Sequence, residues 1–337
     1  MKLCELGEKR IISDIIIPLI NPLGERKLAG DDCAVVEING EDCVTISTDR
    51  VPADLVSFKL GLIDEFELGY YLAVLNISDV ISSGAKPVGI LLNLAFNKDF
   101  SVDNFNNIIK GCKKACDDYD CKIIGGDLSD SEEMNLTATS VGVGKKNRIL
   151  YRRGCKEGDY VYASKYLGLT PTAFLYYQKA KNQGLVLGEE EVLLSVFRYP
   201  KLCSGLASAL SKLAGKYRIT CMDNTDGIYQ SLHEIGKLNH VSMKIDVVKA
   251  KIHPVSNMVA DYMKMDVIDL IFQAGADFGL IGTIDSSILK SELEMLEEQG
   301  LFIFGRVIGD ESDCGRLICE GEKGEREIVA AGWNYYV

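Results

Sequence analysis

The chain has 337 residues, a length at which a single hydrophobic core usually gives way to two, so its size predicts two domains. Hydrophobic residues make up 47% and charged residues 26%, which excludes a disordered chain, and the net charge of −12 argues against nucleic-acid binding. The eleven cysteines form no CxxC pair and are accompanied by only three histidines, which favours reduced thiols in a cytoplasmic protein over a zinc site.

The first half of the chain alternates helical and extended patterns. Its opening helix carries Glu5, Glu8 and Asp14 and lacks a small-residue cleavage site, so it is not expected to be a secretory signal. The longest apolar run, LGYYLAVLNISDVI, is interrupted by polar residues, and no membrane span is predicted. The expected elements are helix 5–19, strands 33–38 and 43–48 joined by an Asn-Gly turn, helices 64–83 and 103–118, and strands 122–124 and 135–144.

A polar stretch over 145–158 marks the expected boundary between a domain of residues 1–150 and a domain of residues 151–337. Helices that alternate with strands on both sides of it predict layered α/β packing. The elements expected after the boundary are strand 160–164, helices 171–182 and 201–214, strand 218–222, helix 227–238, strand 242–247, helix 256–274, strand 278–284, helix 286–299 and short closing strands.

Five aspartate motifs are the most informative feature of the sequence. They are GDD at 30–32, STD at 47–49, NISD at 76–79, GGD at 125–127 and DNTDG at 223–227. Asp49, Asp127 and Asp223 each follow an apolar strand pattern, and strand ends are where α/β proteins build their sites. Asn76 and Asp79 are three residues apart on a predicted helix and share a face of it.

Convergence of so many carboxylates on an acidic chain predicts divalent cations. A single Gly-Asp pair has an equally good structural explanation, because such pairs are common in turns and helix caps. The five motifs together favour magnesium, which prefers oxygen ligands and shares them with phosphate groups. The sequence contains no GxxxxGK[ST], no GxGxxG between strand and helix and no kinase catalytic loop, so ATP would be held through bridging metals and loop backbone.

The order of these motifs resembles that of thiamine-monophosphate kinase, in the family that includes aminoimidazole ribonucleotide synthetase. The matching segments are GDDCAVV, ISTD, NISDVISSGAKP, IIGGD, LYRRGCKEGDYVYAS, MDNTDG, AGADFGL, FGRV and GWNYYV. The resemblance implies a two-domain aminoimidazole ribonucleotide synthetase-like α/β fold. In it, the N-terminal sheet pairs with its copy in a homodimer, and a C-terminal α/β domain closes over ATP.

The resemblance also implies roles for individual residues. Metal ligands would be Asp31, Asp32, Asp49, Asp79, Asp127, Asp223 and Asp226. Nucleotide contacts would come from Thr48, Asp49, Gly125, Gly126, Thr225 and Gly227. Asp127, Asp226 and Arg152 would serve catalysis, and Asp277, Phe278 and Trp333 would lie beside the acceptor. A solvated basic turn is the alternative for Arg152, and packing of the chain end is the alternative for Trp333.

The implied activity is ATP- and magnesium-dependent phosphorylation of thiamine monophosphate. Departures from the family pattern lie on the acceptor side, where Gly-Glu-Asp-Tyr-Glu-Leu is replaced by the residues Gly275 to Leu280, reading GADFGL. One alternative is therefore a relative that uses the same ATP site to activate another small acceptor, such as a carboxamide or carboxylate. A second alternative is a noncatalytic nucleotide or metal sensor.

Overall fold

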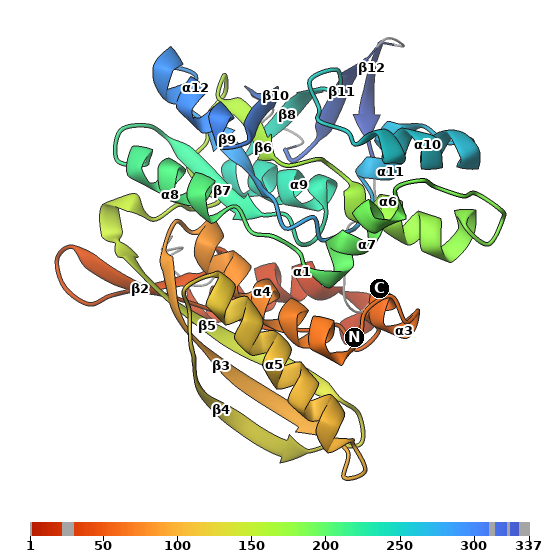
Figure 1. Cartoon of the computed structure of the whole chain (residues 1–337). Coiled ribbons are helices and arrows are strands. Elements are labelled where there is room, and N and C mark those ends of the chain that lie inside the picture. The colour runs from red at the N-terminus through yellow and green to blue at the C-terminus, as the bar shows by residue number, and fades with distance from the viewer. Residues whose placement is uncertain (1, 22–29, 310–313, 322–323, 330–337) are drawn as a thin grey trace.

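The computed structural model describes residues 2–21, 30–309, 314–321 and 324–329 and has a mixed α/β architecture built on two sheets (Figure 1). This confirms the expected fold class. The first sheet has the strand order β1-β2-β5-β3-β4, and the second has the order β12-β11-β8-β10-β6-β9-β7. No helix among the described residues is long and apolar enough to cross a membrane.

The first sheet is built from residues of the N-terminal half. Its strands are β1 (Ala34–Glu37), β2 (Asp42–Arg50), β3 (Lys86–Phe96), β4 (Ile123–Asp130) and β5 (Asn135–Lys145). The helical segments of this half are a 3-10 turn (Leu3–Glu5), α1 (Glu8–Ile11), a π-helical turn (Ile12–Ile16), α2 (Ile17–Ile20), α3 (Val56–Lys59), α4 (Glu65–Ser82), α5 (Val102–Asp118) and a 3-10 turn (Lys146–Arg148). The expected hairpin between β1 and β2 is confirmed, because the two strands pair antiparallel across the Asn-Gly turn.

The second sheet belongs to the C-terminal half. Its strands are β6 (Tyr160–Ser164), β7 (Ile219–Asp223), β8 (Val241–Asp246), β9 (Leu280–Ile284), β10 (Leu301–Gly309), β11 (Leu317–Gly321) and β12 (Gly324–Ile328). The accompanying helices are α6 (Leu169–Leu175), a π-helical turn (Tyr176–Ala180), α7 (Glu190–Arg198), α8 (Ser204–Leu213), α9 (Ile228–Asn239), α10 (Pro254–Met263), α11 (Val267–Ile271) and α12 (Lys290–Glu298).

Helix α4 is the central element of the first half. Asp64 caps its N-terminus by accepting a hydrogen bond from the backbone N–H of Glu67. The Glu67 side chain in turn accepts a hydrogen bond from the backbone N–H of Asp64. The backbone of helix α5 packs directly against that of α4 at Gly111. A Cβ at this position would lie only 1.8 Å from the Phe66 carbonyl oxygen, so only glycine fits. Nearly every residue of α4 from Leu68 onward is buried, so polar groups on this helix need partners.

One face of the first sheet is covered by α4 and α5, and no helix of the described residues covers the other face in the single chain (Figure 1). Strand alternation assigns residues to the two faces. Leu92 and Leu94 of β3 are buried beneath the helices, whereas the intervening Asn93 is exposed. Apolar side chains also lie exposed on the uncovered face, namely Val36, Ile46, Val88, Leu91 and Val143.

The structure departs from the sequence-based elements in several places. Strand β3 and helices α3 and α7 were not predicted. The single helix expected over 256–274 is two helices, because Lys264 adopts a left-handed conformation that ends α10 and Asp266 caps the start of α11. Strand β4 continues to Asp130, well beyond the expected end at residue 124.

Candidate functional site

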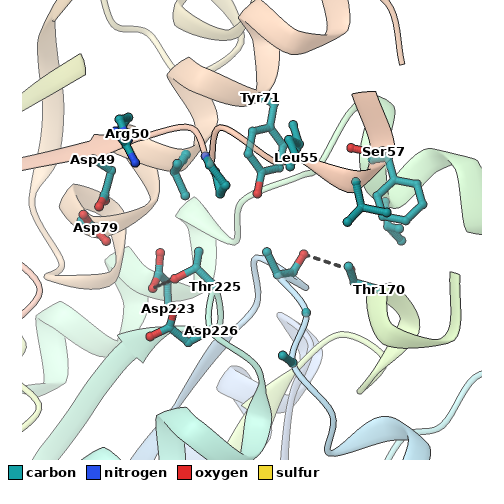
Figure 2. Close-up of a pocket in the computed structure, with 18 of the residues that line it drawn as sticks. Asp49, Arg50, Leu55, Ser57, Tyr71, Asp79, Thr170, Asp223, Thr225 and Asp226 are labelled. Carbon is teal, nitrogen blue, oxygen red and sulfur yellow. Dashed lines mark hydrogen bonds between the residues drawn. The ribbon is translucent and has the colours of Figure 1, made fainter. Parts of the chain in front are cut away.

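A cavity of about 540 Å³ lies between elements of the two halves and is acidic at one end. Figure 2 shows Asp49 and Asp79 facing Asp223 and Asp226 across it. Six of the seven carboxylates expected to bind metal line this cavity, namely Asp31, Asp32, Asp49, Asp79, Asp223 and Asp226. The aspartate motifs were predicted to meet in one place, and these six residues do so.

Asn76 fixes the end of β2 against α4. Its side-chain oxygen accepts a hydrogen bond of 2.9 Å from the Asp49 backbone N–H, and its amide donates to the carbonyls of Asp49 and Leu72. One turn further along α4, Asp79 accepts a 2.6 Å hydrogen bond from the Ser47 hydroxyl. A fully buried amide therefore fixes the backbone of Asp49, and a hydroxyl holds the carboxylate of Asp79.

Asp31 and Asp32 meet Arg152 at another part of the cavity wall. Both carboxylate oxygens of Asp31 accept from the Arg152 backbone N–H at 3.1 Å, and Asp32 accepts from Ser82 at 3.0 Å. The guanidinium Nε lies 3.4 Å from Asp32 Oδ1 and 3.7 Å from Asp31 Oδ1, which is ion-pair distance without hydrogen-bond geometry. Arg152 is therefore part of the acidic site and not a solvated turn residue.

The C-terminal half contributes the loop between β7 and α9. Asp223 is the last residue of β7, as expected from the sequence, and its Oδ1 accepts from the Thr225 hydroxyl at 3.0 Å. The other oxygen, Oδ2, is buried and has no hydrogen-bond partner among the described residues. An unsatisfied buried carboxylate oxygen is costly, so this atom is available to a ligand that supplies positive charge.

Burial and mutual repulsion make these carboxylates hard to ionise in the absence of a cation. Burial raises the pKa of Asp223 to about 6, with Asp49 and Asp226 adding to the rise against opposing hydroxyls. Burial also raises the pKa values of Asp32 and Asp79 well above their ordinary range, and in Asp79 the neighbouring Asp49 adds to the effect. Strongly perturbed carboxylates gathered in a cleft are typical of functional sites.

The carboxylates do not form a ready-made metal cage. In the part of the chain that the structure describes, no three His, Cys, Asp or Glu side chains are arranged to hold a metal ion by themselves. Magnesium is commonly bound by one or two carboxylates together with water and substrate phosphates. The arrangement therefore suits a cation whose remaining ligands come from outside the protein.

The other end of the cavity is apolar and aromatic. Leu55, Tyr71, Phe174 and Phe197 line it, together with Ala276. Behind this wall Phe278 is 1% exposed and packs edge-to-face on Tyr71, with ring centroids 5.5 Å apart. Such a wall suits the ring of an organic molecule placed next to the acidic end.

Several expected site residues lie elsewhere in the single chain. Asp127 is within β4 rather than at a strand end, and it pairs in parallel register with the exposed Asn93, so both lie on the uncovered sheet face. Two strands separate β4 from β2, which places Asp127 roughly 14 Å from the Asp49 strand. Thr48 bonds Ala138 and Thr139 and faces the same side as Asp127.

The glycines and the acceptor-side residues have structural surroundings of their own. Gly125 and Gly126 are inside β4, and Gly227 begins α9; none of the three lines the cavity. Asp277 accepts hydrogen bonds from the backbone N–H groups of Gly168 and Thr170, at 2.7 and 2.8 Å. The side chain expected beside the acceptor thus caps the start of α6. Trp333 lies outside the described residues.

Sequence reasoning missed residues that complete the site. Ser47, which holds Asp79, stands in the STD motif, and the alternation of β2 was the only signal that it faces α4. Ser82 holds Asp32 from the last turn of α4. Lys9 on α1 bonds Asp226 with a distance of 3.1 Å, a contact between residues 217 positions apart that no local pattern indicates.

Comparisons with known proteins identify the class of fold to which this structure belongs. Residues 30–145 match the family model described as AIR synthase related protein, N-terminal domain. The structure of AaThiL complexed with AMPPCP and TMP aligns with a TM-score of 0.80 over 99% of both chains, at 23% identity. Hydrogenase maturation protein HypE aligns with a TM-score of 0.69 at 15% identity, over 98% of this chain and 97% of that one. The chain thus has the AIR synthase-like fold.

Thiamine-monophosphate kinases align with nearly the whole chain. The thiamine-monophosphate kinase of Aquifex aeolicus is 28% identical over 321 residues, covering 91% of this chain and 97% of the relative. The thiamine-monophosphate kinase of Pyrococcus abyssi is 27% identical over 323 residues, covering 95% and 94%. The chain is thus similar over nearly its whole length to thiamine-monophosphate kinases, the family that its motif order resembles.

Proposed function

We propose that this protein is a magnesium-dependent kinase that transfers the γ-phosphoryl group of ATP to thiamine monophosphate. The observation that carries the proposal is a single cavity with a carboxylate-rich end next to an aromatic end. The first suits the metal-bound phosphates of a nucleotide, and the second suits the rings of the acceptor. The activity of the full-length relatives supports the same substrates, and so does the complex of AaThiL with AMPPCP and TMP.

Magnesium fits the residues present. All the donors at the acidic end are oxygens, Asp223 Oδ2 is buried without a partner among the described residues, and like charges raise the pKa values of neighbouring carboxylates. A divalent ion would relieve each of these costs. We propose that ligands of one or more such ions come from Asp31, Asp32, Asp49, Asp79, Asp223 and Asp226, each ion using one or two of them, with Thr225 beside them.

The chain's own residues supply positioning and electrostatics. Bound magnesium would neutralise charge on the phosphate oxygens as the phosphoryl group moves. Asn76 and Ser47 hold Asp49 and Asp79 in place, so the carboxylates need little rearrangement when ligands enter. Arg152 lines the same cavity with a partly exposed guanidinium, whose Nε faces Asp31 and Asp32 and whose planar fork is suited to a phosphate oxygen. An acceptor that is already a phosphate monoester requires no strong general base, and we assign none.

The direct test is a kinase assay on the purified chain with ATP, magnesium and thiamine monophosphate. The expected result is stoichiometric ADP and thiamine diphosphate, measured by chromatography. Asp79→Asn should reduce kcat/KM by more than about 100-fold, because it removes a buried metal ligand. Asp54→Asn is the matched control, since Asp54 also lines the cavity but is exposed and pairs with Lys59. Equal effects of the two variants would contradict the assignment.

A different acceptor is the second candidate, and the aromatic end supplies the observation that favours it. Ala276 lines the cavity in place of one glutamate of the family pattern, Gly279 replaces the other, and the retained Asp277 is engaged in capping α6. A panel of small carboxamides, carboxylates and phosphate esters would separate the candidates by the ADP that each one elicits. ATP binding without turnover on any acceptor would instead favour a noncatalytic sensor.

We further propose that the chain forms a homodimer through the uncovered face of the first sheet. Exposed apolar side chains on this face, including Leu91 and Val143, suit a second copy. Asp127 and Thr48 lie on the same face, so their proposed roles depend on this pairing. Leu91→Lys should yield monomers in sedimentation analysis, whereas Val102→Lys, at an equally apolar but separate exposed site, should remain dimeric. Monomeric wild-type protein would contradict the proposal.

Two further assignments remain proposals. We place the domain boundary within 145–158, between the last strand of the first sheet and the first strand of the second. We propose the cytoplasm as the location, because the ten cysteines that the structure describes are all free and the reaction consumes ATP.

A further inference from the structure

The N-terminal helical segment reaches the acidic site through one side chain. Lys9 of α1 donates a 3.1 Å hydrogen bond to Asp226 Oδ2 and lies 3.8 Å from Glu234 Oε1 of α9. The Lys9 and Asp226 side chains are each 34% exposed, so the pair is at the rim of the site and accessible to ligands. The neighbouring residue of α1, Glu8, lines the cavity itself.

This lysine is an internal counter-cation for a proposed metal ligand. A free divalent ion that binds Asp226 must either displace the ammonium group or accept its repulsion at close range. The same ion bound to a triphosphate forms a complex with net negative charge. When the ion binds Asp226, the Lys9 ammonium group loses the hydrogen bond that it donates to this carboxylate. It can then donate to the phosphate oxygens instead.

The rest of the site points in the same direction. The described carboxylates include no three-residue cage for a cation. At another part of the cavity wall, Arg152 already offsets part of the charge of Asp31 and Asp32. Two basic side chains therefore stand against the acidic cluster, and the cluster relies on outside oxygen atoms to complete a metal's coordination.

We propose that Lys9 is a specificity-determining residue, which disfavours free divalent cations and favours a divalent cation bound to the polyphosphate of a nucleotide. The inference rests on the proposed function, because it assumes that Asp226 binds metal. It adds that the acidic site loads metal and nucleotide together. The N-terminal segment, which contains none of the aspartate motifs, sets this preference.

The test measures binding rather than activity. Mn²⁺ replaces magnesium because its free and bound forms are distinguishable by electron paramagnetic resonance. Each protein is titrated with Mn²⁺ alone and with Mn²⁺ plus a nonhydrolysable ATP analogue. The variants are Lys9→Met, which keeps the length without the charge, and Lys9→Arg, which keeps the charge. Lys216→Met is the control, because Lys216 forms an ion pair with Glu292 remote from the cavity.

The expected result is a change of opposite sign in the two titrations. Lys9→Met should bind free Mn²⁺ about fivefold more tightly and the Mn²⁺–analogue complex about fivefold more weakly, the size expected for one partly exposed charge. Lys9→Arg and Lys216→Met should match the wild type in both titrations.

The other outcomes overturn the inference in distinguishable ways. If Lys9→Met lowers only the melting temperature and leaves both affinities unchanged, the ion pair is purely structural and the proposed function stands. If it weakens both forms equally, Lys9 only orients Asp226. If the wild type binds neither Mn²⁺ nor the complex, the proposed function fails and the inference fails with it.

Discussion

Replacing Asp223 with asparagine should stabilise the metal-free protein at neutral pH. The carboxylate is 3% exposed, and one of its oxygens has no hydrogen-bond partner among the described residues. Asparagine has nearly the same shape and keeps an oxygen that can accept from Thr225. The substitution therefore removes a buried charge with little change in packing.

The magnitude follows from the pKa. Burial, with Asp49 and Asp226 adding to it, raises the pKa of Asp223 from 3.8 to about 6. A rise of roughly two pH units at about 1.4 kcal/mol each sets an upper bound of about 3 kcal/mol at neutral pH. The new amide N–H groups need acceptors in place of Oδ2, so the expected gain is smaller, about 1–2 kcal/mol.

The sign of the pH dependence is also defined. Between pH 4 and pH 6, the folded chain keeps this proton while the unfolded chain has lost it, so the free energy of unfolding decreases as pH rises through that window. The wild type in EDTA should accordingly be more stable toward pH 5 than at pH 7.5, as far as this group contributes. Asp223→Asn should remove that part of the slope.

The assay is urea unfolding in EDTA at pH 5 and pH 7.5. Asp285→Asn is the control, for which the free energy of unfolding should change in the opposite direction. Burial of Asp285 is outweighed by hydrogen bonds from Ser287 and the charge of Arg218, which lower its pKa, so that carboxylate stabilises the fold at neutral pH. Asp285→Asn should therefore be less stable than the wild type at pH 7.5. An Asp223→Asn protein that is also less stable there in EDTA would refute the electrostatic reasoning.

Three further predictions test the elements that hold the site. Gly111→Ala should destabilise the protein by more than about 3 kcal/mol or prevent folding, because its Cβ would lie 1.8 Å from the Phe66 carbonyl oxygen. Gly40→Ala is the control: a Cβ there meets open space, so the free energy of unfolding in urea should hardly change. Asn76→Ala should cost about 2 kcal/mol, because it leaves the Asp49 backbone unsatisfied, and should lower kcat more than it raises KM. Asp277→Ala should reduce the melting temperature, because it removes the cap of α6, with a proportionate loss of soluble protein and no change in acceptor KM.

Local patterns predicted most elements, but not those whose formation depends on tertiary packing. The Asn-Gly turn and the buried apolar face of α4 were readable because their signals are short-range. Strand β3 was missed, although it is the strand on which β4 and β5 both pair and although turn residues, Gly84 and Asn97, flank it. The break between α10 and α11 occurs at Lys264, whose left-handed conformation is not typical of lysine.

The position of an aspartate was predictable where a strand pattern ends beside the cavity and was not predictable where sheet order decides it. Asp223 ends β7, so its place followed from the strand pattern. Asp127 follows a similar pattern, but β4 runs on to Asp130 and occupies the far edge of its sheet. Strand order depends on which surfaces pack together, and the chain's local signals do not encode it. Lys9 shows the same limit, because its contact with Asp226 joins opposite ends of the chain.

The acidic site combines rigidity with electrostatic cost. Asn76 fixes the backbone of Asp49 and Ser47 holds the carboxylate of Asp79, so the two residues stay close together. Burial, with the neighbouring Asp49 adding to it, raises the pKa of Asp79 well above its usual range, and the fold bears this cost until positive charge arrives. Because Asp79 and Asp223 come from different halves of the chain, a cation between them would also draw the halves together. Metal loading and closure of the cavity around its substrates are therefore expected to be coupled.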